Sequence, residues 1–373
     1  MAGPASVLFL SNGDPTDRFH ASGAPAQLLG WLKSSFPTVV AVDVSLHGLA
    51  RFLNIALSWS PNRERWKARL DLNLRSFRRR SKLAQAFVDE RGLVVDAIFQ
   101  MGCLWAPPRV GTAPLYLLLD FTNAIAQAEF PNWAPFRSKM AARRWLEAEG
   151  EVYRRASRIF TASARVRQSL LHDYGIAAEN VSVVGLGGHV EGSKDGEKQF
   201  DGRTILFVGR DFERKGGPLL LQAFRGVRAT IPNARLVIVG PTARGSEPGV
   251  DWIGPVSNRR QLSELFAAAH VFVMPSWCEP FGHVFVEAMN HRLPCVGTNT
   301  GGIPDIVGHG VTGYLVERGD VEGLTAAVVG LLSSPDSSRA LGKAGFVRAA
   351  ADFSWPVVCE RMREGIISTG STR

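Results

Sequence analysis

The sequence has 373 residues, of which 45% are hydrophobic and 21% charged, a composition typical of a globular protein with a sizeable core. The length is sufficient for two domains. No uninterrupted apolar run reaches ~18 residues, which excludes a membrane-spanning helix, and the N-terminus has no basic region followed by a long apolar stretch, so we expect a cytoplasmic protein.

Short apolar runs alternate with helical stretches through the first half of the chain, as in βαβ units built around a parallel sheet. The pattern predicts strands at residues 7–10, 38–44, 97–100, 116–119, 158–161 and 181–184. It predicts helices at residues 24–36, over most of 49–90, and at 141–156 and 164–174.

The formal net charge of +9 is concentrated between Arg63 and Lys82, where nine Arg and Lys residues stand against Glu64 and Asp71. Three interpretations remain open for this basic segment: contact with an anionic membrane surface, contact with nucleic acid, or a solvated helix whose apolar side packs inward. We favour the last and rank nucleic acid third, because no nucleic-acid module accompanies the segment. The interleaved apolar residues are Trp59, Trp66, Leu70, Leu72, Leu74 and Phe77.

A polar, glycine-rich stretch at residues 191–202 interrupts the pattern and is typical of a linker. A second series of strands is predicted after it, at residues 204–209, 235–239, 271–275 and 294–297. Two doubly wound α/β domains with a hinge near residues 186–202 account for this arrangement better than one very long sheet.

The chain is organised around residues 276–287, which place Glu279 in a loop and Glu287 in the helix that follows. A buried strand at 269–275 precedes the loop, so both carboxylates lie near the carboxyl end of a strand, where open α/β sheets bind ligands. The N–H groups at the start of that helix, at about 281–284, would form an anion site between the two carboxylates. We expect phosphate oxygens on the N–H groups and sugar hydroxyls on the carboxylates; the alternative is two unrelated surface glutamates.

Glu279 and Glu287, with seven residues between them inside Glu-Pro-Phe-Gly, resemble the E-x7-E signature of the retaining, nucleotide-sugar-dependent glycosyltransferases of family 4. The resemblance implies the GT-B fold, with two Rossmann-like doubly wound domains facing a cleft. It implies an acceptor-binding domain at 1–186, to which 353–373 returns, and a nucleotide-sugar-binding domain at 187–352. Five further stretches resemble the family in order: 207–217, 251–256, 300–305, 311–316 and 353–355 with the final helix.

The resemblance also implies roles for the donor side of the site. Arg210 and Lys215 lie five residues apart after a strand, where both could neutralise the diphosphate as charge develops on it, and the family typically needs no metal or other cofactor. Glu287 corresponds to the residue that binds the ribose hydroxyls, and Glu279 to the one near the transferred sugar. The resemblance implies that the backbone N–H groups of Phe281, Gly282 and His283 bind sugar or phosphate. Gly301 and Gly302 would form an anion-binding loop or a simple turn. Val256 would lie near the base pocket.

The acceptor side matches the family less well. Asp120 stands where many members have a His-Asp pair, and it could orient the acceptor hydroxyl, take its proton, or cap a following turn. His20 is a second candidate, next to Gly23 in the counterpart of the family's glycine loop. The sequence at 187–190 departs from the family's Asn-Gly-Val-Asp pattern, which affects the acceptor chemistry rather than the donor site.

The spacing of the residues excludes the sequence motifs of several other kinds of site. No third glycine follows Gly185 and Gly187 at the interval of a dinucleotide fingerprint, and no Walker lysine follows Gly245. The four scattered cysteines contain no C-x-x-C pair, which favours buried thiols over disulfides or a zinc site. They are Cys103, Cys278, Cys295 and Cys359.

We therefore expect a retaining glycosyltransferase that moves a hexose from a nucleoside diphosphate sugar to a hydroxyl acceptor. The alternatives are a GT-B sugar-nucleotide epimerase or phosphorylase, and a non-catalytic protein that binds nucleotide sugars. The expected partners are a nucleotide sugar donor, a hydroxyl acceptor and, through Arg63 to Lys82, an anionic membrane that would place the protein at the inner membrane surface. No nucleic acid is expected.

Overall fold

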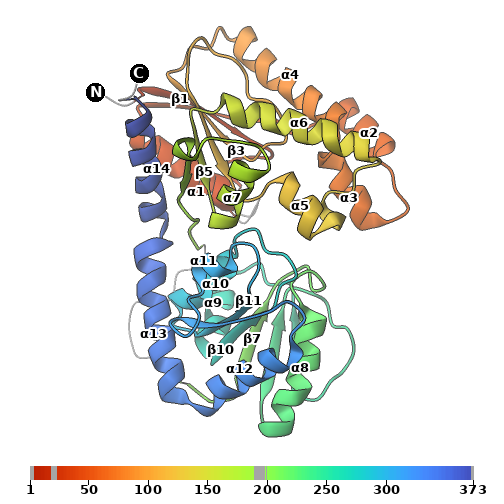
Figure 1. The fold of residues 1–373 in the computed structure, drawn as a ribbon, viewed down its shortest axis with the longest axis vertical. Coiled ribbons are helices and arrows are strands. Elements are labelled where there is room, and N and C mark those ends of the chain that lie inside the picture. Colours follow the sequence, from red (N-terminus) through yellow and green to blue (C-terminus); the bar gives the residue numbers. More distant parts are fainter. Residues whose placement is uncertain (1–3, 18–22, 189–197, 199, 371–373) are drawn as a thin grey trace. The chain divides into compact units, whose positions relative to one another are not determined.

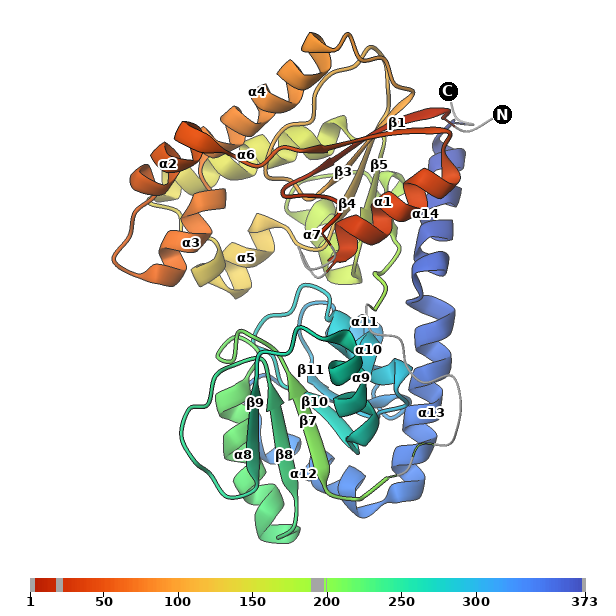
Figure 2. The same ribbon diagram turned by 180° about the vertical axis from the view of Figure 1, so that it is seen from behind.

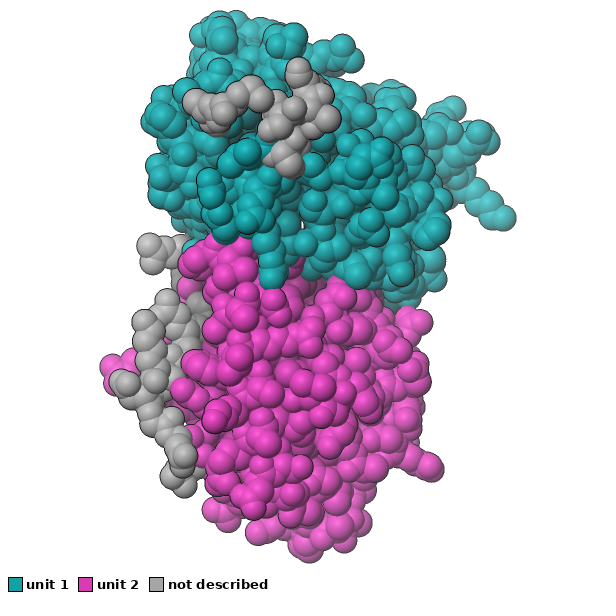
Figure 3. Space-filling model, turned by 60° about the vertical axis from the view of Figure 1, so that its left-hand side comes forward, with its two compact units in different colours: residues 1–184, 359–373 teal, residues 185–358 magenta. Residues whose placement is uncertain are grey.

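The computed structural model describes residues 4–17, 23–188, 198 and 200–370, and Figure 1 shows the elements they form. The chain divides into two compact units (Figure 3). Unit 1 comprises Met1–Val184 and Cys359–Arg373, and unit 2 comprises Gly185–Val358. Most of the expected hinge, residues 189–197 and 199, lies outside the described residues.

Unit 1 is built on a six-stranded parallel sheet with helices on both faces (Figures 1 and 2). The strand order is β2-β1-β3-β4-β5-β6, and the sheet is buried because crossover helices cover it. Phe9 and Phe99, paired in register across β1 and β3, are almost completely buried. The strands are β1 (Ser6–Ser11), β2 (Thr38–Asp43), β3 (Ala97–Met101), β4 (Leu115–Leu119), β5 (Arg158–Thr161) and β6 (Val181–Val183).

Most helices of unit 1 begin at a side chain suited to capping. Asn62, Asn73, Thr122, Ser138 and Ser163 each accept a hydrogen bond from a backbone N–H three residues on, which satisfies a donor that the helix leaves unpaired. The helices are α1 (Ala24–Ser35), α2 (Gly48–Leu57), α3 (Arg63–Asp71), α4 (Leu74–Glu90), α5 (Asn123–Glu129), α6 (Lys139–Arg155) and α7 (Ala164–His172), with short 3-10 turns at Pro131–Trp133 and Ala178–Asn180.

Unit 2 repeats the architecture with strand order β12-β11-β10-β7-β8-β9, again all parallel. The expectation of two doubly wound α/β domains is thereby confirmed. The strands are β7 (Thr204–Val208), β8 (Arg235–Val239), β9 (Val250–Gly254), β10 (Val271–Met274), β11 (Cys295–Thr298) and β12 (Gly313–Val316). The helices are α8 (Gly217–Thr230), α9 (Arg259–Ala268), α10 (His283–Asn290), α11 (Ile303–Ile306), α12 (Val321–Ser333) and α13 (Pro335–Asp352); α14 (Trp355–Gly370) begins in unit 2 and ends in unit 1.

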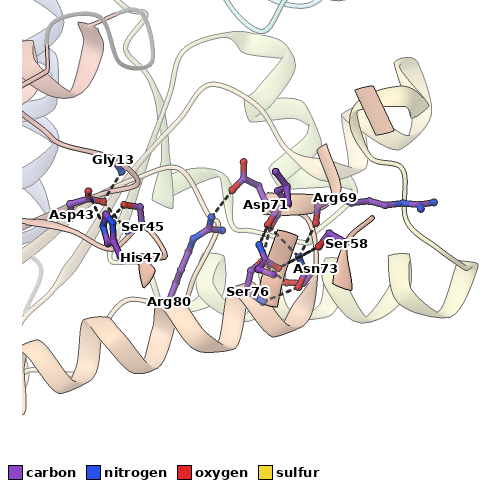
Figure 4. Close-up of polar contacts among 12 residues, drawn as sticks. Gly13, Asp43, Ser45, His47, Ser58, Arg69, Asp71, Asn73, Ser76 and Arg80 are labelled. Atoms are coloured by element: carbon purple, nitrogen blue, oxygen red, sulfur yellow. Dashed lines mark hydrogen bonds and ion pairs between the residues drawn. The ribbon is translucent and has the colours of Figure 1, made fainter. Parts of the chain in front are cut away.

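The basic segment of unit 1 packs its apolar side inward, as the favoured interpretation expects. Phe77 is buried, and Trp66 is half-buried with its indole N–H donating to the carbonyl of Ile55. Arg80 is only 4% exposed and forms an ion pair with Asp71 (Figure 4). The apolar side chains of residues 63–82 therefore stabilise the unit itself.

The neighbouring helix α2 differs from the basic segment because its apolar residues are exposed, and the sequence analysis did not predict this exposure. None of its residues is buried, and Leu49 and Phe52 are 72% and 66% exposed. Leu53, Leu57 and the nearby Trp59 are also exposed. An apolar face of this kind on one helix is a feature of interaction surfaces.

Two further expectations concern the whole chain. All four cysteines lie in the described residues, where they are buried and no disulfide joins them. Among the described residues, no helix combines the length and the apolar character that crossing a bilayer requires.

Candidate functional site

The predicted donor residues lie at one edge of the sheet of unit 2. Because all its strands are parallel, their carboxyl ends lie at the same edge, and β10 pairs with both β7 and β11. Lys215 is in the loop after β7, Glu279 in the loop after β10, and Gly301 in the loop after β11. This is the edge at which open α/β sheets bind ligands.

Glu279 is the centre of a compact cluster of charges. Its Oε2 lies 3.4 Å from Nζ of Lys215 and 3.3 Å from Nη1 of Arg214. The three side chains are only 10%, 16% and 11% exposed, in that order. The structure thus brings together the predicted Glu279 and Lys215 and adds Arg214, which the sequence did not single out.

The two cations determine the charge state of Glu279. Burial alone would raise the pKa of its carboxyl group, but the positive charges of Lys215 and Arg214, and the hydrogen bonds they donate, outweigh burial and hold that pKa below its usual range. Glu279 is therefore ionised at neutral pH. Arg214 also forms an ion pair with Asp211, so the two cations of the cluster are balanced by two carboxylates.

Backbone contacts hold the loops of this cluster together. Arg214 donates from Nη1 to the carbonyl of Cys278 at 2.6 Å and from Nε to Asp211 at 3.1 Å, while its own carbonyl accepts from the N–H of Trp277 at 2.8 Å. Gly216 has φ 74°, and a Cβ there would lie 1.9 Å from the carbonyl oxygen of Pro275. The loop that carries Lys215 is therefore fixed against the loop that carries Glu279.

Gly301 and Gly302 lie against the backbone of the Glu279 loop. The N–H of Gly302 donates to the carbonyl of Glu279 at 3.0 Å. A Cβ on Gly301, which has φ 55°, would lie 1.9 Å from that same oxygen. These glycines allow two loops to approach each other closely, a structural role that goes beyond a simple turn.

Helix α10 begins beside the cluster. Gly282 is its N-cap, with φ 108°, so the helix starts at His283, within the range 281–284 given for its first N–H groups. His283 donates from Nδ1 to the carbonyl of Gly187 at 2.7 Å, and burial lowers its pKa, so the ring is neutral at pH 7. Phe281 is buried against Phe353. The N-terminus of α10, with its positive dipole end, is thus fixed near Glu279.

The other predicted donor residues lie at the same edge of the sheet. Glu287 is buried one turn along α10 from His283, and its side chain lies next to Gly188. Arg210 is exposed directly after β7, where its backbone passes Gly240, and Val256 is half-buried two residues after β9. Their roles toward a ligand stay predictions.

The predicted acceptor residues belong to unit 1. Asp120 is exposed directly after β4. It is not the N-cap of α5, because the hydroxyl of Thr122 has that position, so the capping alternative for Asp120 is wrong. Gly23, with φ 82°, is the N-cap of α1, and His20 lies outside the described residues.

A polar group at the end of β2 was missed by sequence reasoning. Asp43 Oδ1 accepts from the N–H groups of Gly13 and Ser45, both at 2.8 Å, and its Oδ2 lies 3.7 Å from Nε2 of His47 (Figure 4). Asp43 lies inside the predicted strand at 38–44, so the apolar pattern did not single it out. Like Asp120, this group lies at the carboxyl edge of the unit 1 sheet.

Comparison with known proteins identifies the class. The fold is that of sucrose-phosphate synthase from Thermosynechococcus elongatus (TM-score 0.71, 18% identity, 99% of this chain and 100% of that one). It is also that of Anabaena Alr3699/HepE, solved in complex with UDP-glucose (TM-score 0.65, 17% identity, 97% and 99%). This confirms the GT-B fold for the two α/β units.

The amino-acid sequence is also similar to a known protein family and to individual proteins. Residues 191–348 match the family described as "Glycosyl transferases group 1". A MMP alpha-(1->4)-mannosyltransferase from Mycolicibacterium hassiacum is 32% identical over 234 residues, covering 59% of this chain and 57% of that protein. A D-inositol 3-phosphate glycosyltransferase from Mycobacterium avium is 29% identical over 276 residues, covering 67% and 62%. The match to the group 1 glycosyl transferases thus lies within the second unit, and the chain spans about three fifths of the length of these two relatives.

Proposed function

We propose that this protein is a retaining glycosyltransferase that transfers a hexose from a nucleoside diphosphate sugar to a hydroxyl acceptor. The observation that carries the proposal is the buried cluster of Glu279, Lys215 and Arg214 at the carboxyl edge of the unit 2 sheet. The match of residues 191–348 to the group 1 glycosyl transferases supports it, as do the two relatives, whose names describe transfer of sugars.

The cluster suits the diphosphate of such a donor. Lys215 and Arg214 place two cations near the N-terminus of α10, whose positive dipole end also attracts an anion. Arg210 would supply a third cation from the start of the same loop. As the bond to the sugar breaks, negative charge grows on the leaving phosphate, and cations already in place stabilise it without rearrangement.

The carboxylates and the backbone donors would hold the rest of the donor. We assign Glu287 to the ribose hydroxyls, Glu279 to the hexose, and Val256 to the side of the base. The backbone N–H groups of Gly282 and His283 would bind sugar or phosphate oxygens. An ionised Glu279 accepts hydrogen bonds from hydroxyls, which is the charge state that its surroundings impose.

The acceptor would bind to the domain formed by 1–186 and 353–373, with 187–352 holding the donor. Asp120 is the proposed residue that orients the acceptor hydroxyl or takes its proton, with Gly23 and His20 as further candidates. In a retaining transfer the hydroxyl enters on the face that the diphosphate leaves, so the leaving phosphate oxygen can help remove the proton of that hydroxyl.

A thermal-shift screen tests the donor proposal directly. We expect UDP, GDP or ADP, or one of their hexose derivatives, to raise the melting temperature. A ligand that binds only the folded state at ~100 times its Kd adds ~2.7 kcal/mol to the free energy of unfolding. The absence of a shift with every nucleotide sugar of the panel would contradict the proposal.

We also propose that unit 1 contacts an anionic membrane surface, and that α2 provides the apolar part of the contact. Leu49, Phe52 and Trp59 are exposed, and the exposed cations of the basic segment lie close to α2 in the chain. Exposed apolar side chains beside basic ones bind the interface of anionic bilayers. These cations include Arg63, Arg65, Arg75, Arg78, Arg79 and Lys82, and α2 itself adds the exposed Arg51.

Flotation with liposomes that contain phosphatidylglycerol measures this contact. We expect the double variant L49S/F52S to float several-fold less than the unsubstituted protein, because it removes most of the apolar face of α2. The control V94S changes an equally exposed apolar residue of unit 1 outside α2 and should float normally. Equal flotation of all three proteins would refute the membrane contact through α2.

A further inference from the structure

Unit 1 contains a cavity of about 230 Å³ that the proposed transfer reaction does not use. Its walls come from the end of α2, the end of α3, the start of α4 and the start of α6. Four arginines line it: Arg69, Arg75, Arg137 and Arg144. A cavity with four cations requires an explanation, because like charges repel one another.

The cations of this cavity are not neutralised by its walls. Among the described side chains that line it there is no Asp or Glu. The carboxylates nearest in the chain are engaged by arginines that do not line the cavity: Asp71 pairs with Arg80 at 2.5 Å, and Glu147 pairs with Arg143 at 2.9 Å. Figure 4 shows Arg69 extending away from the Asp71–Arg80 pair.

The arginines are held in place by backbone carbonyls. Arg69 donates from Nε to Pro135 at 2.8 Å, and Arg75 and Arg137 each donate from Nη2 to Leu57, at 3.2 and 2.7 Å. A guanidinium has five N–H donors, so these bonds orient each group and use only a part of its capacity. Burial lowers the pKa of Arg69, and the positive charges of Arg137, which also lines the cavity, and of Arg65 lower it further.

Two long helices also begin at the cavity. Helices α4 and α6 each have 17 residues, and their N-caps, Asn73 and Ser138, are both lining residues. The positive ends of both helix dipoles therefore lie at the same cavity as the four arginines. The remaining wall is apolar and is formed by Leu57, Leu72, Leu74, Phe136 and Met140.

We infer that this cavity is a binding site for a phosphate group, carried either by a lipid headgroup or by a soluble phosphorylated molecule. Guanidinium groups bind phosphate oxygens in pairs of parallel hydrogen bonds, and an anion here would relieve the repulsion between the arginines. The apolar wall would contact the carbon part of the ligand. The site is independent of the proposed nucleotide site in unit 2.

The test compares two double variants of the full-length chain that remove the same charge. R75Q/R144Q removes two cations from the cavity, whereas K33Q/R109Q removes two exposed cations of unit 1 that lie outside both the cavity and the basic segment. Calorimetric titration with inorganic phosphate reports a soluble ligand. Co-sedimentation with phosphatidylcholine vesicles, with and without phosphatidylglycerol, reports a lipid headgroup.

We expect R75Q/R144Q to weaken binding at least tenfold in one of these two assays, and K33Q/R109Q to change it less than twofold. The assay that shows the difference identifies the source of the phosphate. Equal losses in the two variants would show diffuse attraction and would overturn the site, as would an absence of binding in both assays. If R75Q/R144Q does not fold, M140E replaces it, because it places a carboxylate on the exposed side of the cavity wall and should weaken binding to the same degree.

Discussion

Lys215→Ala is expected to lower the turnover of the donor by about 10²–10³-fold, the effect typical of removing one group that stabilises a developing anion. Nζ of Lys215 lies 3.4 Å from Glu279, at the point where the loops after β7 and β10 meet. Without this cation, Arg214 remains paired with both Glu279 and Asp211, and these two carboxylates outnumber the cation left to bind the diphosphate. The measurement is kcat for release of the nucleoside diphosphate, using the donor that the thermal-shift screen identifies.

Two controls separate catalysis from folding. Lys343→Ala removes an exposed lysine of α13 in the same unit and should leave kcat unchanged. Arg210→Ala removes an exposed cation outside the Glu279 ion pairs, so it should lower kcat with little change in melting temperature. Near-normal turnover by Lys215→Ala would refute its assignment to the diphosphate.

Gly301→Ala is expected to destabilise the protein strongly and to reduce donor binding. Its φ of 55° costs a non-glycine residue about 1–3 kcal/mol. The new methyl group would also lie 1.9 Å from the carbonyl oxygen of Glu279, so the loop carrying that carboxylate must move. The free energy of unfolding in urea and the Kd of the nucleotide measure the two effects.

Gly310→Ala is the matched control for this variant. Gly310 also has a positive φ, 73°, but a Cβ there has no atom within 4 Å. The Gly310→Ala variant should therefore lose only the stability that the backbone conformation costs, and it should bind nucleotide normally. Gly301→Ala and Gly310→Ala could instead lose the same stability and the same affinity for nucleotide. That result would show that the close contact between the loops after β10 and β11 does not contribute to nucleotide binding.

The fold and much of the donor site could be predicted because their signals are local. Buried parallel strands appear as apolar runs, and Glu279, Lys215, Gly282 and Gly301 stand at fixed distances after such runs. Glu279 and Lys215 are close together because β7 and β10 are neighbours in the sheet. Such proximity is expected, because ligand-binding loops of parallel sheets follow the carboxyl ends of the strands. This explains why a two-domain α/β architecture could be predicted without coordinates.

The rest of the site could not be predicted, because it depends on the directions in which side chains point, and the sequence pattern does not determine these directions. Arg210 and Arg214 occupy the same loop, yet Arg214 turns inward to Glu279 and Arg210 stays exposed, because the turn that precedes Gly216 sets both directions. The hydrophobic pattern of α2 likewise predicts a helix but not that its apolar face is exposed. The arginine-lined cavity could not be foreseen either, since its cations come from residues 69–75 and 137–144, which are far apart in the chain.

Hydrogen–deuterium exchange with and without UDP, GDP or ADP tests most directly whether the Glu279 cluster binds the donor diphosphate. We predict that the nucleotide that raises the melting temperature slows exchange in three segments: residues 209–217, 279–288 and 299–303. These are the loops after β7, β10 and β11 with the start of α10. Slowed exchange confined to other segments, with these three unchanged, would contradict the account.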